Sequence, residues 1–157
     1  MDTTKFKLVE NPTITDMRKI VTAIAKKYDN NATPLFKHRR TLNELAKTFM
    51  RMNIEDTLAV FENIETHKLA GVIACKVGEL WWIEGSILFE ELVVSLEDTP
   101  TGFGSFAVDL LEYIAKENAC VMICSGSSMV QSSKIVQNMY KKHGFVVYGE
   151  SYLKELE

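Results

Sequence analysis

The chain has 157 residues, of which 46% are hydrophobic and 25% are charged, and its formal net charge is -3. A chain of this length can bury one sizeable core, so we expect a single domain over residues 1–157. No apolar run approaches the ~20 residues that span a bilayer, so no membrane partner is expected. The charge is +6 over residues 1–54 and -9 over residues 55–157. Such an acidic chain is a poor nucleic-acid binder, so no nucleic-acid partner is expected.

The N-terminal sequence and the cysteines both favour a reducing, cytoplasmic location. The first ten residues lack the basic start and apolar core of a signal peptide. Cys75, Cys120 and Cys124 lie in apolar segments, and an odd number of cysteines without paired spacing favours buried, reduced thiols. No histidine stands at a zinc-ligand spacing from them, so we expect no metal.

The first third of the chain favours one strand followed by two helices. Polar and apolar residues alternate over Lys5–Glu10, which is typical of a half-buried strand. Apolar residues then recur on one helical face from Ile14 to Tyr28. A second helix is predicted over Leu42–Met52, with Thr41 as its N-cap and Glu44 at the capping-box position.

The middle of the chain changes to strand-like patterns. Thr57–Ile64, Lys68–Val77 and Ser86–Ser95 are predicted as strands joined by short polar links, which indicates an antiparallel meander. Trp81 and Trp82 lie near the second link. We favour a hairpin flank packed on the sheet for this pair over a platform for substrate.

The last third adds a helix, a strand, a short helix and a strand-like end. Phe103–Glu117 has the spacing of a strongly amphipathic helix, and Ala119–Cys124 is predicted as a short buried strand. The following helix should end at Gly144, a typical C-cap residue, and Phe145–Leu156 should supply one or two strands. The predicted order is therefore β-α-α-β-β-β-α-β-α-β, an α+β fold.

A loop with Gly102 and Gly104 precedes the Phe103–Glu117 helix, and three phosphate-binding devices compete for it. A P-loop is excluded, because no lysine follows Gly104. The residues from Gly102 to Ala107 formally match the dinucleotide pattern GxGxxA. That pattern requires an acidic residue after the next strand, where this chain has Ser125–Ser127. A nucleotide-dependent oxidoreductase is therefore disfavoured.

The third device depends on two motifs. From Val94 the chain runs through Thr99 to Gly102 and Gly104, and a second segment, MYKKHGF, covers Met139–Phe145. The first motif resembles the pyrophosphate loop of the GCN5-related N-acetyltransferases, the GNAT superfamily, with Thr99 where the family has Arg or Gln. The second resembles the family's later signature. The two together are more specific than either alone, and the resemblance extends over nearly the whole chain.

This resemblance implies the GNAT fold, a mostly antiparallel twisted sheet of 6–7 strands flanked by about four helices. It implies acetyl-CoA as co-substrate, direct transfer of the acetyl group to a primary amine of a small molecule or protein, and no metal. It is also compatible with a homodimer. The thioester would lie where Ser86–Ser95 and Ala119–Cys124 splay apart. The acceptor would bind against the first two helices, their loop at Tyr28–Thr41 and the C-terminal strands.

The resemblance also implies the coenzyme contacts. Backbone N–H groups at the start of the Phe103–Glu117 helix can bind a pyrophosphate, and glycine allows the chain to approach it closely. Thr99 and Pro100 depart from the family pattern, because the long polar side chain and one N–H donor are missing. A catalytically degenerate CoA-binding or regulatory protein is therefore the alternative. The implied contacts are Val94, Thr99, Thr101, Gly102, Phe103, Gly104, Ser105 and Ser133.

Three residues are candidates for the chemistry. The resemblance gives Tyr140 the role of proton donor to the leaving thiolate; the alternative is an aromatic side chain that closes the core. Glu90 and Glu91 precede the loop, where family members keep an acid that can serve as base. Neighbouring residues on a strand face opposite sides, so at most one of them points into the site. Alternatively, both are solvated or edge residues.

Overall fold

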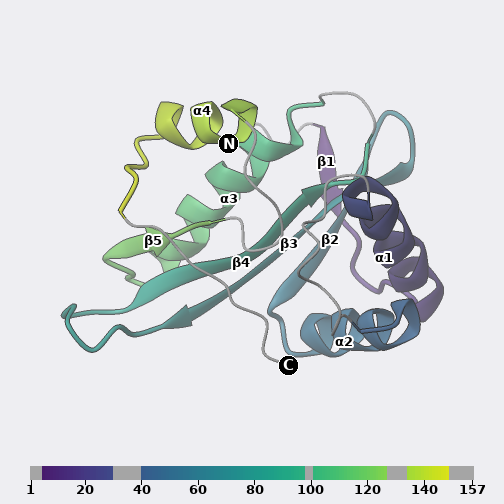
Figure 1. Ribbon diagram of the computed structural model, residues 1–157, viewed down its shortest axis with the longest axis horizontal. Helices are drawn as coiled ribbons and strands as arrows, with labels where there is room; N and C mark the ends of the chain where they lie inside the picture. Colours follow the sequence, from purple (N-terminus) through teal and green to yellow (C-terminus); the bar gives the residue numbers. More distant parts are fainter. Residues whose placement is uncertain (1–4, 30–39, 98–100, 127–133, 149–157) are drawn as a thin grey trace.

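The computed structural model describes residues 5–29, 40–97, 101–126 and 134–148. These residues form an open sheet with helices on both faces (Figure 1). None of the described helices is long and apolar enough to cross a membrane. In chain order the elements are β1 (Phe6–Leu8), α1 (Ile14–Asp29), α2 (Leu42–Ile54), β2 (Leu58–Asn63), β3 (Lys68–Gly78), β4 (Ile87–Ser95), α3 (Phe103–Glu117), β5 (Met122–Cys124) and α4 (Lys134–Lys142).

The sheet has the order β1-β2-β3-β4-β5. The first four strands pair in an antiparallel meander, and β5 joins β4 in parallel after the crossover through α3. The predicted meander, the α+β class and the order of elements as far as α4 are thereby confirmed. The described residues form five strands, where 6–7 were predicted. Residues 145–148 form no strand, and residues 149–156 of the predicted last strands lie outside the described residues.

The two faces of the sheet carry two separate hydrophobic clusters. Helices α1 and α2 cover one face, and α3 covers the other (Figure 1). In β3, Val72 and Ala74 belong to the cluster under α1 and α2, whereas Ile73 belongs to the cluster under α3. This alternation follows from the two-residue period of a strand. It explains why β3 is a nearly continuous apolar run in the sequence.

Reciprocal caps fix the starts of the two N-terminal helices. At α2, Thr41 Oγ1 accepts a hydrogen bond from the Glu44 N–H, and the Glu44 carboxylate accepts one from the Thr41 N–H. The predicted capping box is confirmed. Thr13 and Asp16 exchange the same pair of bonds before α1. Each cap satisfies N–H groups that a helix leaves without partners.

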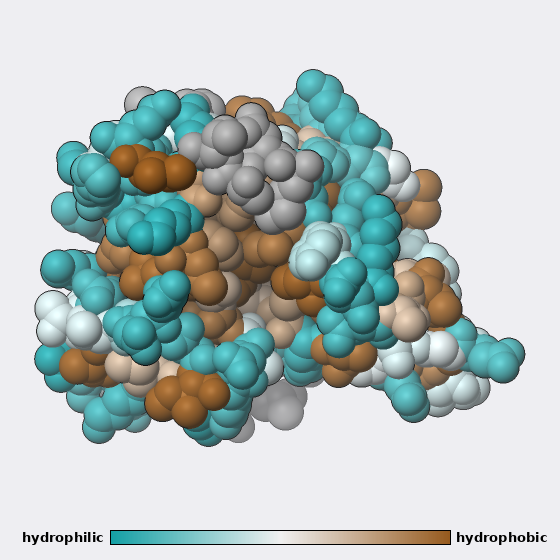
Figure 2. Space-filling model, turned by 180° about the vertical axis from the view of Figure 1, so that it is seen from behind, coloured by the Kyte–Doolittle hydropathy of each residue, from teal (hydrophilic) through white to brown (hydrophobic). Residues whose placement is uncertain are grey.

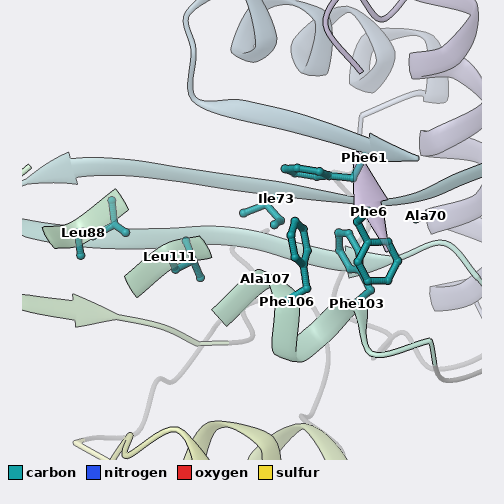
Figure 3. Close-up of a cluster of buried hydrophobic side chains, with 10 residues drawn as sticks. Phe6, Phe61, Ala70, Ile73, Leu88, Phe103, Phe106, Ala107 and Leu111 are labelled. Atoms are coloured by element: carbon teal, nitrogen blue, oxygen red, sulfur yellow. The ribbon is translucent and has the colours of Figure 1, made fainter. Parts of the chain in front are cut away.

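An aromatic cluster fastens the start of α3 to the sheet (Figure 3). Phe103 is 1% exposed, and its ring meets Phe6 edge-on at a centroid distance of 5.3 Å. Phe61 and Phe106 complete the cluster, with ring centroids 5.2 Å apart. Gly71 on β3 lies beneath the Phe103 ring, and a Cβ there would come within 2.3 Å of it. Close packing of Phe103 on Gly71 therefore holds the N-terminus of α3 on the sheet. Any larger residue at position 71 would overlap the Phe103 ring.

Strand β5 differs from its predicted character. The segment Ala119–Cys124 was predicted as buried, but β5 covers only Met122–Cys124, and both of these residues are exposed. The reason is topological: among the described strands, β5 has β4 as its only neighbour and lies at the edge of the sheet. The prediction that all three cysteines are buried is likewise wrong for Cys124, whereas Cys75 and Cys120 are half-buried; all three are free thiols.

We expect Gly71→Ala to lower the free energy of unfolding by about 1–3 kcal/mol, because the added methyl group overlaps the Phe103 ring. Urea denaturation measures this change. Gly126→Ala is the matched control, because a Cβ at Gly126 meets nothing within 4 Å. Replacing Phe103 by Leu in the Gly71→Ala background should restore part of the loss. Equal stability of the two alanine variants would show that the packing at Gly71 is not tight.

Candidate functional site

The candidate site lies where β4 and β5 stop pairing. Their parallel register covers three pairs, from Ile87 with Met122 to Phe89 with Cys124. Glu90 is the first residue of β4 beyond this register, and Ser125 is the first residue beyond β5. The backbone of β4 from Glu90 onward is thus free of β5, at the position where the splayed strands were predicted.

A β-bulge in β4 decides which glutamate faces this position. Ala74 pairs with Leu92 and Cys75 with Glu90, so Glu91 is an extra residue between two pairs. An extra residue interrupts the strict alternation of faces. Before the bulge Leu88 packs in the α3 cluster, and after it Val93 does, five residues later. Glu90, two residues after Leu88, therefore faces α3 and α4.

Tyr140 on α4 and Glu90 on β4 form a direct pair. The Tyr140 hydroxyl lies 2.7 Å from each carboxylate oxygen of Glu90, so it donates a hydrogen bond to the carboxylate. Both side chains are partly buried. Glu91, by contrast, forms an ion pair with Lys76 of β3. Of the two glutamates, Glu90 is the one that meets Tyr140.

Burial shapes the acid–base properties of this pair. Desolvation raises the pKa of Glu90, and the hydrogen bond that Tyr140 donates counteracts part of the rise. Desolvation, together with the negative charge of Glu90, strongly raises the pKa of Tyr140. A neutral phenol is thus held against a carboxylate of increased basicity. The buried Ser125 Oγ has no hydrogen bond of good geometry among the described residues, so it can bind a further polar group.

The YKKHGF segment has a structural explanation, because it forms the C-terminal cap of α4. The Phe145 N–H donates to the Tyr140 carbonyl, and the Gly144 N–H donates to the Lys141 carbonyl. These two bonds define a Schellman motif, and Gly144 has the positive φ of 82° that the motif requires. The predicted cap at Gly144 is confirmed. The cap also places the Phe145 ring against the Tyr140 ring, with centroids 5.2 Å apart. This contact restricts the position of the Tyr140 side chain.

His143 follows α4 and faces α3. Its Nδ1 lies 3.7 Å from an oxygen of Asp109 and 3.9 Å from an oxygen of Glu112, both on α3. His143 is thus a helix-end residue at the contact between α3 and the helix that carries Tyr140.

The start of α3 can accept an anion. Its N-cap residue Gly102 has a φ of 88° and provides no side-chain cap, and the first turn has no acidic residue. A Cβ at Gly102 would meet nothing within 4 Å, so the space beside it is open. Within the first turn the Phe106 N–H binds the Gly102 carbonyl. The N–H groups of residues 103–105 lie at the helix end, where such groups lack intrahelical partners.

Two lysines bind the ends of the loop that leads into α3. Lys27 of α1 donates to the Ser95 carbonyl at 2.7 Å. Lys5, next to β1, donates to the Thr101 carbonyl at 3.4 Å. Their ammonium groups place one positive charge at Ser95 and another at Thr101. The Thr101 hydroxyl oxygen is buried and has no partner among the described residues. Neither Lys5 nor Ser125 can be predicted as a site residue from the sequence, because nothing local to either residue indicates what it contacts across the fold.

The predicted coenzyme residues serve different purposes. The side chains of Val94 and Phe103 are buried in the two cores, so only their backbone groups can face a ligand. Ser105 is exposed at the first turn of α3. A Cβ at Gly104 would lie 2.6 Å from Met139 Sδ of α4. Gly104 therefore lets α4 pack closely on α3.

Several predicted contacts lie outside the described residues. Thr99 and Pro100 of the loop and Ser133 before α4 belong to this group. The same holds for residues 30–39 of the predicted acceptor loop and for residues 149–156 of the C-terminal segment. The described site thus consists of the Glu90–Tyr140 pair with Ser125, and of the start of α3 with its two lysines.

Comparison with known proteins gives a result at the level of structure. No protein-family model matches the chain, and no curated protein does. A predicted acetyltransferase from Clostridium acetobutylicum, solved with acetyl-CoA, is similar to 96% of this chain and 94% of its own, with a TM-score of 0.65 and 17% identity. Glucosamine-6-phosphate N-acetyltransferase from Arabidopsis thaliana is similar to 97% of this chain and 99% of its own, with a TM-score of 0.63 and 17% identity.

A third solved structure is that of ribosomal-protein-alanine N-acetyltransferase from Brucella melitensis, with a TM-score of 0.64, 11% identity and coverage of 96% and 99%. These three proteins are described as acetyltransferases and come from different organisms, and each is similar over almost its full length. Identities this low establish the fold alone. The chain therefore has the fold of the GCN5-related N-acetyltransferases, the GNAT fold.

Proposed function

We propose that this protein is an acetyl-CoA-dependent N-acetyltransferase that moves an acetyl group directly to a primary amine. The observation that carries the proposal is the hydrogen bond between the raised-pKa pair Tyr140 and Glu90, located where β4 and β5 part. A proton donor and a proton acceptor in contact are the groups that transfer from a thioester to an amine requires. The acceptor is a small molecule or a protein.

The start of α3 is the proposed anchor for the coenzyme. Free N–H groups at a helix N-terminus favour a pyrophosphate, and no acidic residue of the first turn opposes it. The open space beside Gly102 gives the ligand access to the backbone. Lys5 contributes an ammonium group at the loop, which offsets the missing long polar side chain at Thr99. When bound, acetyl-CoA supplies the activated acetyl thioester.

Glu90 and Tyr140 divide the proton transfers between them. Glu90 accepts a proton from the amine nitrogen as the new C–N bond forms. Tyr140 donates its phenolic proton to the sulfur as the C–S bond breaks. The proton on Glu90 then passes to the Tyr140 oxygen through their 2.7 Å hydrogen bond, which restores both groups. The products are an amide and the free thiol, so atoms and charges balance.

The alternative is a GNAT-fold protein that binds CoA without transferring the acetyl group. The features that favour it are Thr99 and Pro100, which depart from the usual loop sequence. Binding and transfer are separable by experiment, because calorimetry with CoA tests the loop and thiol release tests the Glu90–Tyr140 pair.

Tyr140→Phe should lower kcat for thiol release by about 10²-fold or more, because the variant keeps the ring but loses the proton donor. The dissociation constant for CoA should remain unchanged. Tyr113→Phe is the matched control, since Tyr113 is an exposed tyrosine of α3. If Tyr140→Phe retains the wild-type turnover with every amine that the wild type acetylates, the proposed proton donor is wrong.

Glu90→Gln and Glu91→Gln should separate the two adjacent carboxylates. Glu90→Gln should reduce kcat/KM by about 10²-fold and remove the acidic limb of its pH profile, because the base is lost. Glu91→Gln breaks only the ion pair with Lys76 and should stay within about twofold of wild type. The acidic limb should lie above pH 4.5, because the pKa of Glu90 is raised from that value. Equal losses in the two variants would contradict the assignment.

The same pair of variants gives a prediction for stability. The folded protein holds a proton on Glu90 more tightly than the unfolded chain does, because the pKa of Glu90 is raised in the fold. The contribution of Glu90 to stability is therefore lost as pH rises from 4.5 to the folded pKa of this group. The stability of Glu90→Gln relative to wild type should rise over this window. Denaturation at a series of pH values measures the difference, and Glu91→Gln should show no such trend.

Lys5→Met should weaken CoA binding by about threefold to tenfold, because it removes a positive charge from the proposed pyrophosphate loop. Isothermal titration calorimetry at low salt measures the effect. Lys7→Met, which replaces an exposed lysine of β1 two positions from Lys5, is the matched control. Pantetheine lacks the pyrophosphate, so its binding should not respond to either change. A wild type that binds NAD but not CoA would refute the coenzyme assignment altogether.

A further inference from the structure

The hairpin between β3 and β4 projects from the body of the molecule with two exposed tryptophans. Its tip extends beyond β5 (Figure 1) and stands out at the lower right of the opposite view (Figure 2). Trp81 is 91% exposed and Trp82 is 50% exposed. The prediction that this pair packs on the sheet is therefore wrong. The hairpin extends beyond the neighbouring strand β5, so β5 does not cover its tip.

The two indole rings stand at a right angle to one another. Their centroids are 5.1 Å apart, and the angle between their planes is 80°. In an edge-to-face pair of this kind the two rings enclose an angle, and part of each ring face stays exposed to solvent. The faces of indole rings attract cations more strongly than those of other aromatic side chains. Burial of this exposed aromatic surface by a partner would also contribute favourable free energy to binding.

The charges around the tip have one sign. Glu79 and Glu84 flank the tryptophans and are exposed. Neither forms an ion pair within the described part of the chain. The nearest basic residue in the sequence, Lys76, is paired with Glu91. The tip thus combines aromatic faces with uncompensated negative charge, which complements a cation.

The separation of the tip from the proposed active site indicates the kind of partner. Glu84 lies six positions before Glu90, and of the residues between them only Ile87–Phe89 belong to β4. In Figure 1 the end of the hairpin lies beyond β5 and away from α4, which carries Tyr140, so a ligand that covers the tip and reaches Glu90 is an extended one. We propose that the tip, residues 79–84, binds a lysine- or arginine-bearing segment of a polypeptide. This surface does not depend on the proposed acetyl transfer. If transfer occurs, the same polypeptide can carry the acceptor amine.

The negative charge decides against two other occupants. An anionic membrane would be repelled by Glu79 and Glu84. A second copy that met this tip with its own tip would bring four carboxylates together. A basic polypeptide faces neither cost, because its ammonium or guanidinium groups can pair with the carboxylates and stack on the indoles.

Tryptophan fluorescence can test the proposal directly. The chain has two tryptophans, and both lie at the tip, so intrinsic emission reports on this surface alone. A decalysine peptide should change the emission in a saturable way, whereas decaglutamate should not. Glu79→Gln/Glu84→Gln should weaken decalysine binding by roughly threefold to tenfold. Trp81→Phe should weaken it less and keep Trp82 as reporter. Glu10→Gln, an exposed acid next to β1, is the control and should bind like wild type.

Three outcomes would overturn the proposal. The first is an equal response to decalysine and decaglutamate, or none to either. The second is a blue shift with vesicles of phosphatidylcholine and phosphatidylserine but no response to decalysine, which would indicate a membrane surface. The third is an emission that changes with protein concentration and ignores decalysine, which would indicate a second copy. Because no acetyl transfer is measured, an inactive protein leaves the test intact.

Discussion

The β-bulge at Glu91 is the constraint on which the rest of the site depends. In a regular strand, residues 88, 90, 92 and 94 would share one face. With the extra residue, Leu88 and Glu90 face α3 and α4, whereas Val94 returns to the cluster under α1 and α2. The strand can thus present one carboxylate beside Tyr140 and still fill both cores. Glu91 itself is left at the surface, where Lys76 pairs with it.

The partial burial of the Glu90–Tyr140 pair lowers the stability of the fold. Loss of hydration raises the pKa of Glu90, and the neighbouring Ser125 oxygen is buried without a partner among the described residues. Unsatisfied and desolvated groups of this kind typically lower stability by 1–3 kcal/mol each. The aromatic cluster around Phe103 and the cap at Gly144 hold α3 and α4 in place against that cost. Such local costs are common at functional sites.

Most of the fold was predictable from the sequence, because its signals are local. The predicted bounds of the Phe103–Glu117 helix coincide with α3. The capping box was predictable because Thr41 and Glu44 lie three positions apart in the sequence. The choice between Glu90 and Glu91 was not predictable, because the bulge arises from pairing with Ala74 and Cys75 on another strand. The exposure of Trp81 had no local signal either, since periodicity does not tell how far a hairpin extends beyond its sheet.

The two glycines of the loop show how one sequence pattern can combine two constraints. Gly102 has a positive φ beside open space, so its need is conformational. Gly104 lies against Met139, and a Cβ there would come within 2.6 Å of the sulfur. The helix end proposed for the coenzyme and the helix that carries Tyr140 therefore meet at a single residue. Any side chain at position 104 would act on both at once, because Met139 adjoins Tyr140 in α4. The glycine pattern thus sets the distance between the start of α3 and the helix that carries Tyr140, and it also allows the turn at Gly102.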